Sequence, residues 1–220
     1  MSESLLEVPL NEVLYDDEFN CRGPISPLDV ADLAKDIDRD GLLQPIVLSM
    51  LENPTASKKY KLIAGHRRYR AHQVLRKDTI KAVVRDEILS DVDARVLNLK
   101  ENVQRKQLNI YQEAKALEPL KRSGLSEVEV ADRLGASRGW IQIRFLLLKL
   151  PEEIQQEAAA GFLTQTAIRD IYTHFKREGK EAAFEVAKQF KDAKIAGKVN
   201  VRKKLKKDTA TKKTGTKAYR

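Results

Sequence analysis

Apolar positions in the first ninety residues predict short strands that alternate with helices. The apolar runs that predict strands are residues 8–13, 45–48, 60–64 and 80–84. Between the first two runs, apolar residues recur at helical spacing from Val30 to Ile37, which predicts an amphipathic helix over residues 28–39. A second helix is predicted over residues 66–76. This alternation indicates an α/β or α+β unit.

From residue 91 onward the apolar spacing is helical. The predicted helices are residues 91–104, 110–122, 127–134, 138–148, 152–160, 164–175 and 179–195. We expect a first domain over residues 1–104 and a helical domain over residues 105–196. The remaining tail, residues 197–220, is rich in Lys, Thr and Gly and has little to bury, so it is predicted to be disordered.

Residues 125–150 have the pattern of a helix-turn-helix. Ser126 is a capping residue, and Val130, Ala131 and Leu134 form the apolar face of the helix that follows it. Gly135 stands where the turn between two helices needs a residue that tolerates positive φ. The pattern favours a DNA-binding motif over an ordinary helical hairpin, the alternative interpretation.

The start of the second helix in such a motif enters the major groove of DNA. Its polar residues are Ser137, Arg138, Gln142 and Arg144. Either arginine is able to pair with guanine, and Gln142 with adenine. Alternatively, the arginines contact phosphate and position the helix without specifying sequence.

A basic cluster, GHRRYRA (residues 65–71), follows the strand predicted at residues 60–64. Gly65 at a strand-to-helix junction lets the backbone approach an anion, which the helix N-terminus attracts. Arg67, Arg68 and Arg70 add positive charge. Because neighbours on a helix point in different directions, we expect only one or two of them to contact a ligand. The cluster predicts a phosphate site, with structural ion pairs as the alternative.

A second polar segment, ENVQR (residues 101–105), stands at the predicted domain junction. Glu101 and Asn102 place a carboxylate beside an amide, and such oxygen ligands suit Mg²⁺ and a triphosphate together. Arg105 is able to pair with phosphate through two parallel hydrogen bonds. Without the basic cluster, the segment is better explained as a solvated helix end.

The net charge of +9 is located in the C-terminal part of the chain. Residues 176–220 contain sixteen Lys/Arg and five Asp/Glu, a net charge of +11, which leaves −2 for the rest. Such a tail suits a polyanion such as nucleic acid, with anionic lipid as the weaker alternative. Cys21 is the only cysteine, which excludes an internal disulfide and fits a reducing cytoplasm. The first residues lack an export signal, and no apolar run is long enough to span a bilayer.

Taken in order, these segments resemble the ParB family of partition proteins. The matching segments are LLQPI (residues 42–46), GHRRYRA, ENVQR, LNIYQEA (residues 108–114) and the helix-turn-helix with its LKLPEE extension (residues 125–155). The resemblance covers about residues 5–175. It implies an α+β nucleotide-binding domain followed by an all-α helix-turn-helix DNA-binding domain.

The resemblance further implies a CTP-dependent clamp that recognises a palindromic, centromere-like DNA site and then spreads along DNA. It implies CTP and Mg²⁺ as cofactors, a homodimer, a ParA-type ATPase as a further partner, and a cytoplasmic place on the nucleoid or a plasmid. No catalytic residue is assigned. The residues carried over by position are Gly65, Arg67, Arg68, Glu101, Asn102, Arg105 and Arg22, with Glu101 and Asn102 as the metal ligands.

Three features depart from the family pattern. His66 replaces the usual glutamate, a residue that is able to position water or metal. The resemblance therefore implies CTP binding more strongly than it implies slow CTP hydrolysis. Arg144 stands where the recognition helix often has an apolar residue. Most family members also end in a folded dimerisation domain, whereas this sequence ends in a lysine-rich tail, so either dimerisation lies elsewhere or the chain is shortened.

Two other hypotheses fit parts of the sequence. One is a helix-turn-helix transcriptional regulator that does not spread on DNA. The other is an enzyme, because the glycine-histidine-arginine order also resembles the site of sulfiredoxin. That chemistry needs a cysteine beside the histidine, and Cys21 is the single candidate.

Overall fold

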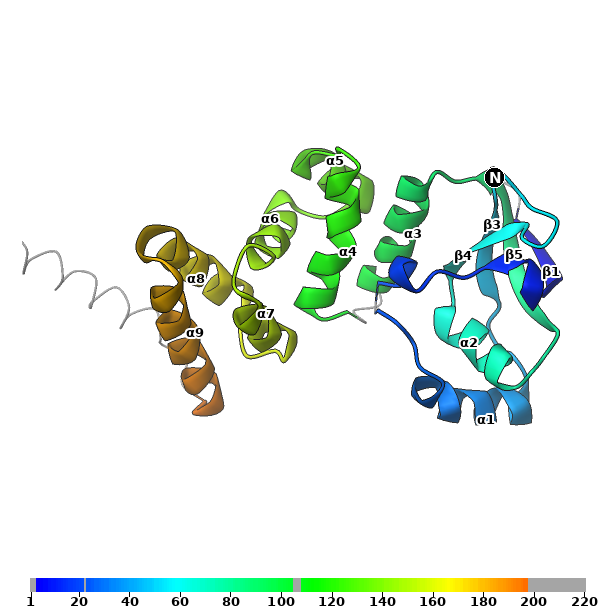
Figure 1. Ribbon diagram of the computed structural model, residues 1–220, viewed down its shortest axis with the longest axis horizontal. Helices are drawn as coiled ribbons and strands as arrows, with labels where there is room; N and C mark the ends of the chain where they lie inside the picture. Colours follow the sequence, from blue (N-terminus) through cyan, green and yellow to red (C-terminus); the bar gives the residue numbers. More distant parts are fainter. Residues whose placement is uncertain (1–2, 22, 105–107, 198–220) are drawn as a thin grey trace, which may run out of the picture. The chain divides into compact units, whose positions relative to one another are not determined.

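A computed structural model describes residues 3–21, 23–104 and 108–197 (Figure 1). The described chain forms two compact units. The first unit takes in residues 1–108 and 115–138, and the second takes in residues 109–114 and 139–220. None of the helices in these described ranges is long and apolar enough to cross a membrane.

The first unit contains a five-stranded mixed sheet. Its strands are β1 (Glu3–Pro9), β2 (Val13–Leu14), β3 (Ile46–Met50), β4 (Tyr60–Ala64) and β5 (Thr79–Ile88). They lie in the order β1-β5-β3-β4-β2. The β1–β5 and β3–β4 pairs are antiparallel, whereas β3–β5 and β2–β4 are parallel. Strand β4 begins and ends where the apolar run predicts.

The single strand predicted at residues 8–13 is wrong. Residues Leu10–Glu12 form a 3-10 turn, which separates β1 from β2. The turn carries the chain from one edge of the sheet to the other, and the backbone N–H of Leu10 donates to the carbonyl of Asp78 instead of to a neighbouring strand. Val8 and Val13 are both buried, so the apolar run marks two short strands rather than one.

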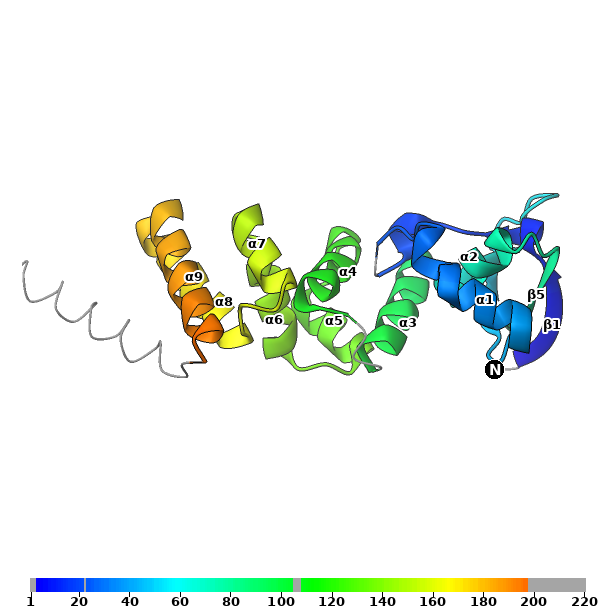
Figure 2. The same cartoon turned by 90° about the horizontal axis from the view of Figure 1, so that it is seen from below.

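Helices cover both faces of this sheet. Helix α2 (His66–Val74) packs against β3 and β5, and α1 (Ala31–Asp40) packs against α2, as the views in Figures 1 and 2 both show. Helix α3 (Asp91–Gln104) packs against β4. Because neighbouring strand residues point to opposite faces, Leu62 joins the core beneath α2 and Ile63 joins Ala94 of α3.

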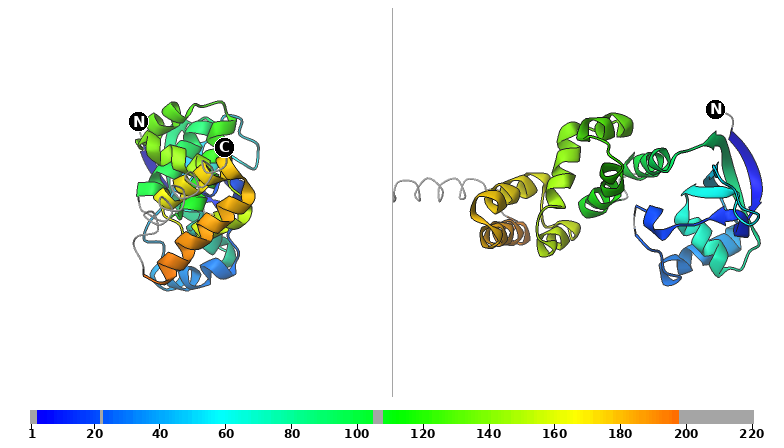
Figure 3. Two further views of the ribbon diagram at one scale, coloured as in Figure 1. Left: turned by 90° about the vertical axis from the view of Figure 1, so that its left-hand side faces the viewer. Right: turned by 45° about the horizontal axis from the view of Figure 1, so that its top comes forward.

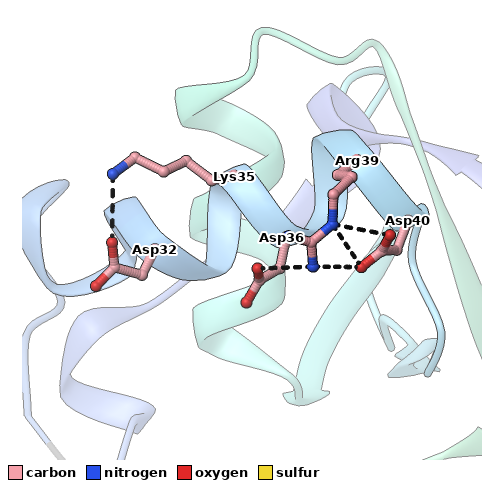
Figure 4. A network of polar contacts seen from close by, with 5 residues as sticks. All are labelled: Asp32, Lys35, Asp36, Arg39 and Asp40. Atoms are coloured by element: carbon pink, nitrogen blue, oxygen red, sulfur yellow. Dashed lines mark hydrogen bonds and ion pairs between the residues drawn. The ribbon is translucent and has the colours of Figure 1, made fainter.

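The outward face of α1 carries a network of ion pairs (Figure 4). Lys35 pairs with Asp32 at 3.4 Å, and Arg39 pairs with Asp36 and Asp40 at 3.3 and 2.7 Å. All of these side chains are exposed, so the pairs add little to stability. Ala34 and Ile37, on the opposite face, pack with Ala71 of α2 and hold the helix in place.

The helices after residue 109 agree closely with the predicted spans. They are α4 (Ile110–Arg122), α5 (Glu127–Leu134), α6 (Arg138–Leu147), α7 (Glu152–Ala159), α8 (Gln165–Glu178) and α9 (Lys180–Ile195). In the second unit, α8 and α9 pack as a pair (Figure 3, right). Gly179 stands between the two helices. Ile154, Ile168 and Ile171 lie in the apolar core of this unit.

Candidate functional site

A pocket of about 220 Å³ lies in the first unit beside the junction between β4 and α2. Its walls come from the start of α2, the end of α3 and the segments before β3. The charged side chains are two guanidinium groups and one carboxylate, which leaves the pocket with net positive charge. The lining residues are Asn20, Ile25, Leu33, Gln44, Gly65, His66, Arg67, Arg68, Asn98, Glu101 and Asn102.

Gly65 forms the turn from strand to helix with a left-handed backbone, at φ 98° and ψ 25°. It precedes the first turn of α2, which has no acidic residue, and no side chain caps the helix. The backbone N–H groups of a first turn have no partners within their own helix and attract negative charge. The pocket therefore has a helix N-terminus at one wall, which suits an anion.

The two arginines of this turn also support the surrounding backbone. Arg68 donates from Nη1 to the carbonyls of Gln44 and Pro45, at 2.8 and 2.6 Å. Arg67 donates from Nη2 to the carbonyl of Asp29, at 2.8 Å. A guanidinium group has five N–H donors, which is more than the bonds to these carbonyls use. Arg70 instead donates to Gln73, one turn further along α2.

The facing wall comes from α3, where three polar residues occupy two consecutive turns. Asn98 donates from Nδ2 to the carbonyl of Ile63 at 2.6 Å, and its Oδ1 accepts from the thiol of Cys21. Asn102 donates from Nδ2 to the carbonyl of Asn98 at 2.9 Å. This bond uses the amide nitrogen of Asn102, so its Oδ1 is the atom suited to a cation. Glu101 lines the same wall with a carboxylate.

His66 lies buried at the base of α2 between two aromatic rings. Its ring centroid is 5.8 Å from that of Tyr15 and 6.2 Å from that of Phe19. Lys61 and Arg95 lie over the Phe19 ring, with 4.5 and 5.1 Å to its centroid. The imidazole is therefore part of a packed wall of the pocket.

Asp91 holds the two cations beside Phe19. It accepts from Lys61 and from Arg95, the latter at 2.7 Å. Burial alone would raise the pKa of Asp91, but the hydrogen bonds from Lys61 and Arg95 outweigh it and hold the pKa below its ordinary value. The carboxylate thus stays charged and keeps both cations against the aromatic ring.

The pocket brings together the predicted nucleotide-site residues that the structure describes. Gly65, Arg67, Arg68, Glu101 and Asn102 all line it. The other two predicted residues, Arg22 and Arg105, lie outside the described residues. Their roles in binding stay predictions.

Sequence reasoning missed five residues of the lining: Asn20, Ile25, Leu33, Gln44 and Asn98. Gln44 belongs to the LLQPI segment and Asn98 stands one helical turn before Asn102, so both had a signal in the sequence. Asn20 and Ile25 lie in an irregular connection, where the spacing of apolar residues does not predict which side chains face a pocket.

Helix α5 begins with a reciprocal cap. The Ser126 hydroxyl accepts from the backbone N–H of Glu129 at 3.2 Å, and the Glu129 carboxylate accepts from the N–H of Ser126 at 2.8 Å. The helix ends at Gly135, which is left-handed at φ 66°. These are the start and turn that the sequence pattern predicts.

Three of the four predicted DNA-contacting residues in and just before α6 are open to solvent. Ser137, Arg138 and Gln142 are exposed. Arg144 is only 3% exposed, and its guanidinium pairs with Glu113 of α4. A buried guanidinium held by a carboxylate is not available to a base edge or a phosphate. We therefore correct the prediction for Arg144 and remove it from the DNA-contacting set.

Within the described ranges, no group of three or more His, Cys, Asp and Glu side chains is arranged to hold a metal ion. Mg²⁺ is commonly held by one or two protein oxygen ligands together with phosphate oxygens of a substrate. Glu101 and Asn102 fit that kind of shared site, because they supply two oxygen-bearing side chains at a wall of an anion-attracting pocket.

Two protein-family models match the chain, one over each half. The ParB N-terminal domain matches residues 1–103, and the ParB HTH domain matches residues 106–207. The nucleoid occlusion protein of Bacillus pumilus is 35% identical over 173 residues, which cover 78% of this chain and 57% of that protein. A probable chromosome-partitioning protein ParB of Pseudomonas putida is 36% identical over 176 residues, covering 80% and 59%. The chain thus spans less than two thirds of the length of these curated relatives.

A solved structure shares the fold. It is the C-terminally truncated chromosome-partitioning protein ParB from Caulobacter crescentus complexed to the centromeric parS site, with a TM-score of 0.57 and 27% identity. The match covers 83% of this chain and 91% of that one. It confirms the predicted α+β domain followed by a helical helix-turn-helix domain. By both of its domains, the chain belongs to the ParB family.

Proposed function

We propose that this chain is a CTP-dependent DNA clamp that recognises a centromere-like site and takes part in plasmid, phage or chromosome partition. The observation that carries the proposal is the pocket itself. It joins a helix N-terminus and two arginines to a carboxylate and an amide, in a chain that also has an exposed recognition helix. The pocket suits a nucleoside triphosphate, and we choose CTP among the nucleotides because of the resemblance to the ParB family.

In this proposal the triphosphate lies against Gly65 and the first turn of α2. Backbone N–H groups there bind phosphate oxygens, and Arg67 and Arg68 add charge-assisted hydrogen bonds. Arg68 also holds Gln44 and Pro45, so occupation of the pocket and the conformation of the segment before β3 are linked through one side chain.

The metal in this proposal is Mg²⁺, which Glu101 and Asn102 of the α3 wall would hold together with the bound triphosphate. Glu101 supplies a carboxylate oxygen and Asn102 an amide oxygen. Magnesium neutralises part of the triphosphate charge when bound, and this explains why a carboxylate is tolerated in a pocket for an anion. Arg105 would add a phosphate contact from the segment that follows.

The DNA contacts are assigned to the exposed start of α6. Ser137 and Arg138 stand at its N-terminus and Gln142 one turn later. Arginine to guanine and glutamine to adenine are the favoured major-groove pairings. The basic tail, residues 197–220, adds contacts to DNA of any sequence.

The similar proteins support a role on the bacterial nucleoid or a plasmid. Their names describe chromosome partitioning and nucleoid occlusion, and one is solved on its centromeric DNA site. We extend the proposal to a homodimer on a palindromic site, with a ParA-type ATPase as a further partner.

The length of DNA protected from a single specific site tests this function. The chain is mixed with a long duplex that carries one selected site, with Mg²⁺ and with or without CTP, and the protected length is mapped. Protection that extends beyond the site only with CTP is the expected result. Protection confined to the site under both conditions would instead identify a transcriptional regulator that does not spread.

A further inference from the structure

One buried ion pair joins the first turn of α4 to the recognition helix. Arg144 of α6 donates to the Glu113 carboxylate from Nη2 and Nε, at 2.6 and 2.9 Å. The side chains are 4% and 13% exposed. Both N–H groups donate to the same carboxylate oxygen, Oε2, and these two charge-assisted hydrogen bonds fix where the guanidinium lies relative to Glu113. Both residues lie in the second unit.

The same guanidinium also holds the residue one turn earlier in α6. Its Nη1 donates to the carbonyl of Trp140 at 3.1 Å, and its central carbon lies 3.8 Å from the centroid of the Trp140 ring. Trp140 follows directly after the exposed residues Ser137, Arg138 and Gly139. Arg144 therefore connects the exposed first turn of the helix to a fixed carboxylate.

Glu113 has a well-defined position in its own helix. The N–H of Gln112 donates to Oδ1 of Asn109 at 2.8 Å, and the N–H of Asn109 donates to Oε1 of Gln112 at 3.0 Å. This reciprocal cap fixes the first turn of α4, which contains Glu113. A carboxylate in a first turn is also favoured by the helix dipole.

A buried pair of this kind is a poor source of stability, because two charges lose their hydration. Burial accordingly lowers the pKa of Arg144 below its ordinary value, and the Glu113 charge opposes that change. The best-attested use of buried ion pairs and polar groups is to select one geometry among several. Here the selected geometry is that of the helix that carries the exposed Arg138 and Gln142.

We propose that the Glu113–Arg144 pair is a positioning device, which orients the first turn of α6 for site-specific DNA recognition without touching DNA. The inference rests on the proposed DNA-binding function. It also accounts for an arginine at a position where an apolar residue is usual. The affinity for the specific site therefore depends on the pair, whereas the affinity for DNA of any other sequence does not.

The experiment compares three variants with the unmodified chain. Glu113→Gln removes the charge and keeps the shape. The double variant Glu113→Leu with Arg144→Met replaces the pair by apolar side chains, an exchange that commonly preserves stability. Glu157→Gln is the matched control, because it breaks the 2.6 Å pair between Glu157 and Lys191 in the same unit.

The DNA probe is a short duplex enriched from a random pool by the unmodified chain, with a scrambled duplex as the non-specific reference. Trp140 is the only tryptophan, so its fluorescence reports directly on the Arg144 contact. Thermal unfolding gives stability in parallel. Affinity for both duplexes gives the specificity ratio, which loss of stability alone does not change.

We expect Glu113→Gln and the double variant to shift the Trp140 emission and to lower the specificity ratio about tenfold, the size of one lost base contact. The double variant keeps the unfolding temperature of the unmodified chain, and Glu157→Gln keeps the ratio. An unchanged specificity ratio in a folded double variant would show that the pair contributes only to packing. Enrichment of no duplex by the unmodified chain would overturn the proposed function, and the inference with it.

Discussion

Gly65 and Ile46 are in such close contact that no side chain fits between them. A Cβ on Gly65 would lie 2.7 Å from Cγ2 of Ile46 and 3.2 Å from its Cα. Ile46 is fully buried in β3, so it has no room to move away. The start of α2 can therefore lie directly against the sheet, and the residues of this start, Gly65 to Arg68, line the pocket.

Gly65→Ala is expected to lower the free energy of unfolding by about 2–4 kcal/mol, because a clash with a buried residue adds to the strain of a left-handed backbone. Gly135→Ala is the matched control. Gly135 is also left-handed, but a Cβ there meets nothing within 4 Å. It should therefore cost only about 1 kcal/mol. Equal losses in chemical denaturation would show that the Ile46 contact is unimportant.

Arg67 and Arg68 should separate binding from stability. Arg68→Ala leaves the carbonyls of Gln44 and Pro45 without this donor, so we expect a loss of about 1–2 kcal/mol in stability as well as weaker nucleotide binding. Arg67→Ala should weaken nucleotide binding about tenfold and leave stability nearly unchanged, because the Asp29 carbonyl that it releases is exposed to water. Calorimetric titration and denaturation measure the two effects. Lys35→Ala on α1 is the control, and an equal loss of binding in that variant would indicate a non-specific charge effect.

Stability should depend on the protonation of His72. Burial lowers the pKa of this histidine below its ordinary value of 6.5, and the hydrogen bond with the Arg68 carbonyl opposes the change only in part. The unfolded chain therefore binds the proton more readily than the folded chain. This contribution to stability is fully present above about pH 6.5 and is lost as the pH falls through the folded pKa.

Denaturation of the unmodified chain and of His72→Gln between about pH 7.5 and pH 5 checks this sign. We expect the unmodified chain to lose stability toward acid, and the variant to lose less over the same interval. The same slope in both proteins would show that other groups cause the acid sensitivity.

Arg138→Ala should weaken DNA binding without affecting the pocket. Loss of one base or phosphate contact is expected to lower affinity for the selected duplex about tenfold. Nucleotide binding should stay unchanged, because Arg138 does not line the pocket. Arg133→Ala, which breaks an exposed pair with Asp93, is the control in gel-shift titrations. Loss of nucleotide binding in Arg138→Ala would contradict the separation of the two sites.

Much of the fold was predictable because its signals are local. Helices α3, α4 and α5 begin and end at the predicted residues, and α5 has a serine cap and a terminal glycine in the sequence. The strand at residues 60–64 is bounded by the glycine that starts α2. The strand over residues 8–13 was wrong, because the two halves of that run pair at opposite edges of the sheet.

The errors in the site have a different cause. Arg144 was placed in the DNA-contacting set because it is polar, although it is two residues from Gln142 and so lies on the opposite side of the helix. Its partner Glu113 lies 31 residues earlier. Helical periodicity contains no information about a pair so far apart. Asn98 and Gln44 were missed for a similar reason, because tertiary contacts place them at the pocket. Asn98 is brought there by the packing of α3 against β4, and Gln44 by the hydrogen bond from Arg68 to its carbonyl.

Binding of CTP in the pocket is the basis of the proposed clamp. Calorimetric titration of the unmodified chain with CTP in Mg²⁺, beside ATP, GTP and UTP and with or without the selected duplex, tests it most directly. We expect saturable binding of CTP alone, lost in Arg67→Ala. Intact DNA binding with no binding of any of the four nucleotides would contradict the claim, and would leave the Gly65 turn and its arginines with a structural role only.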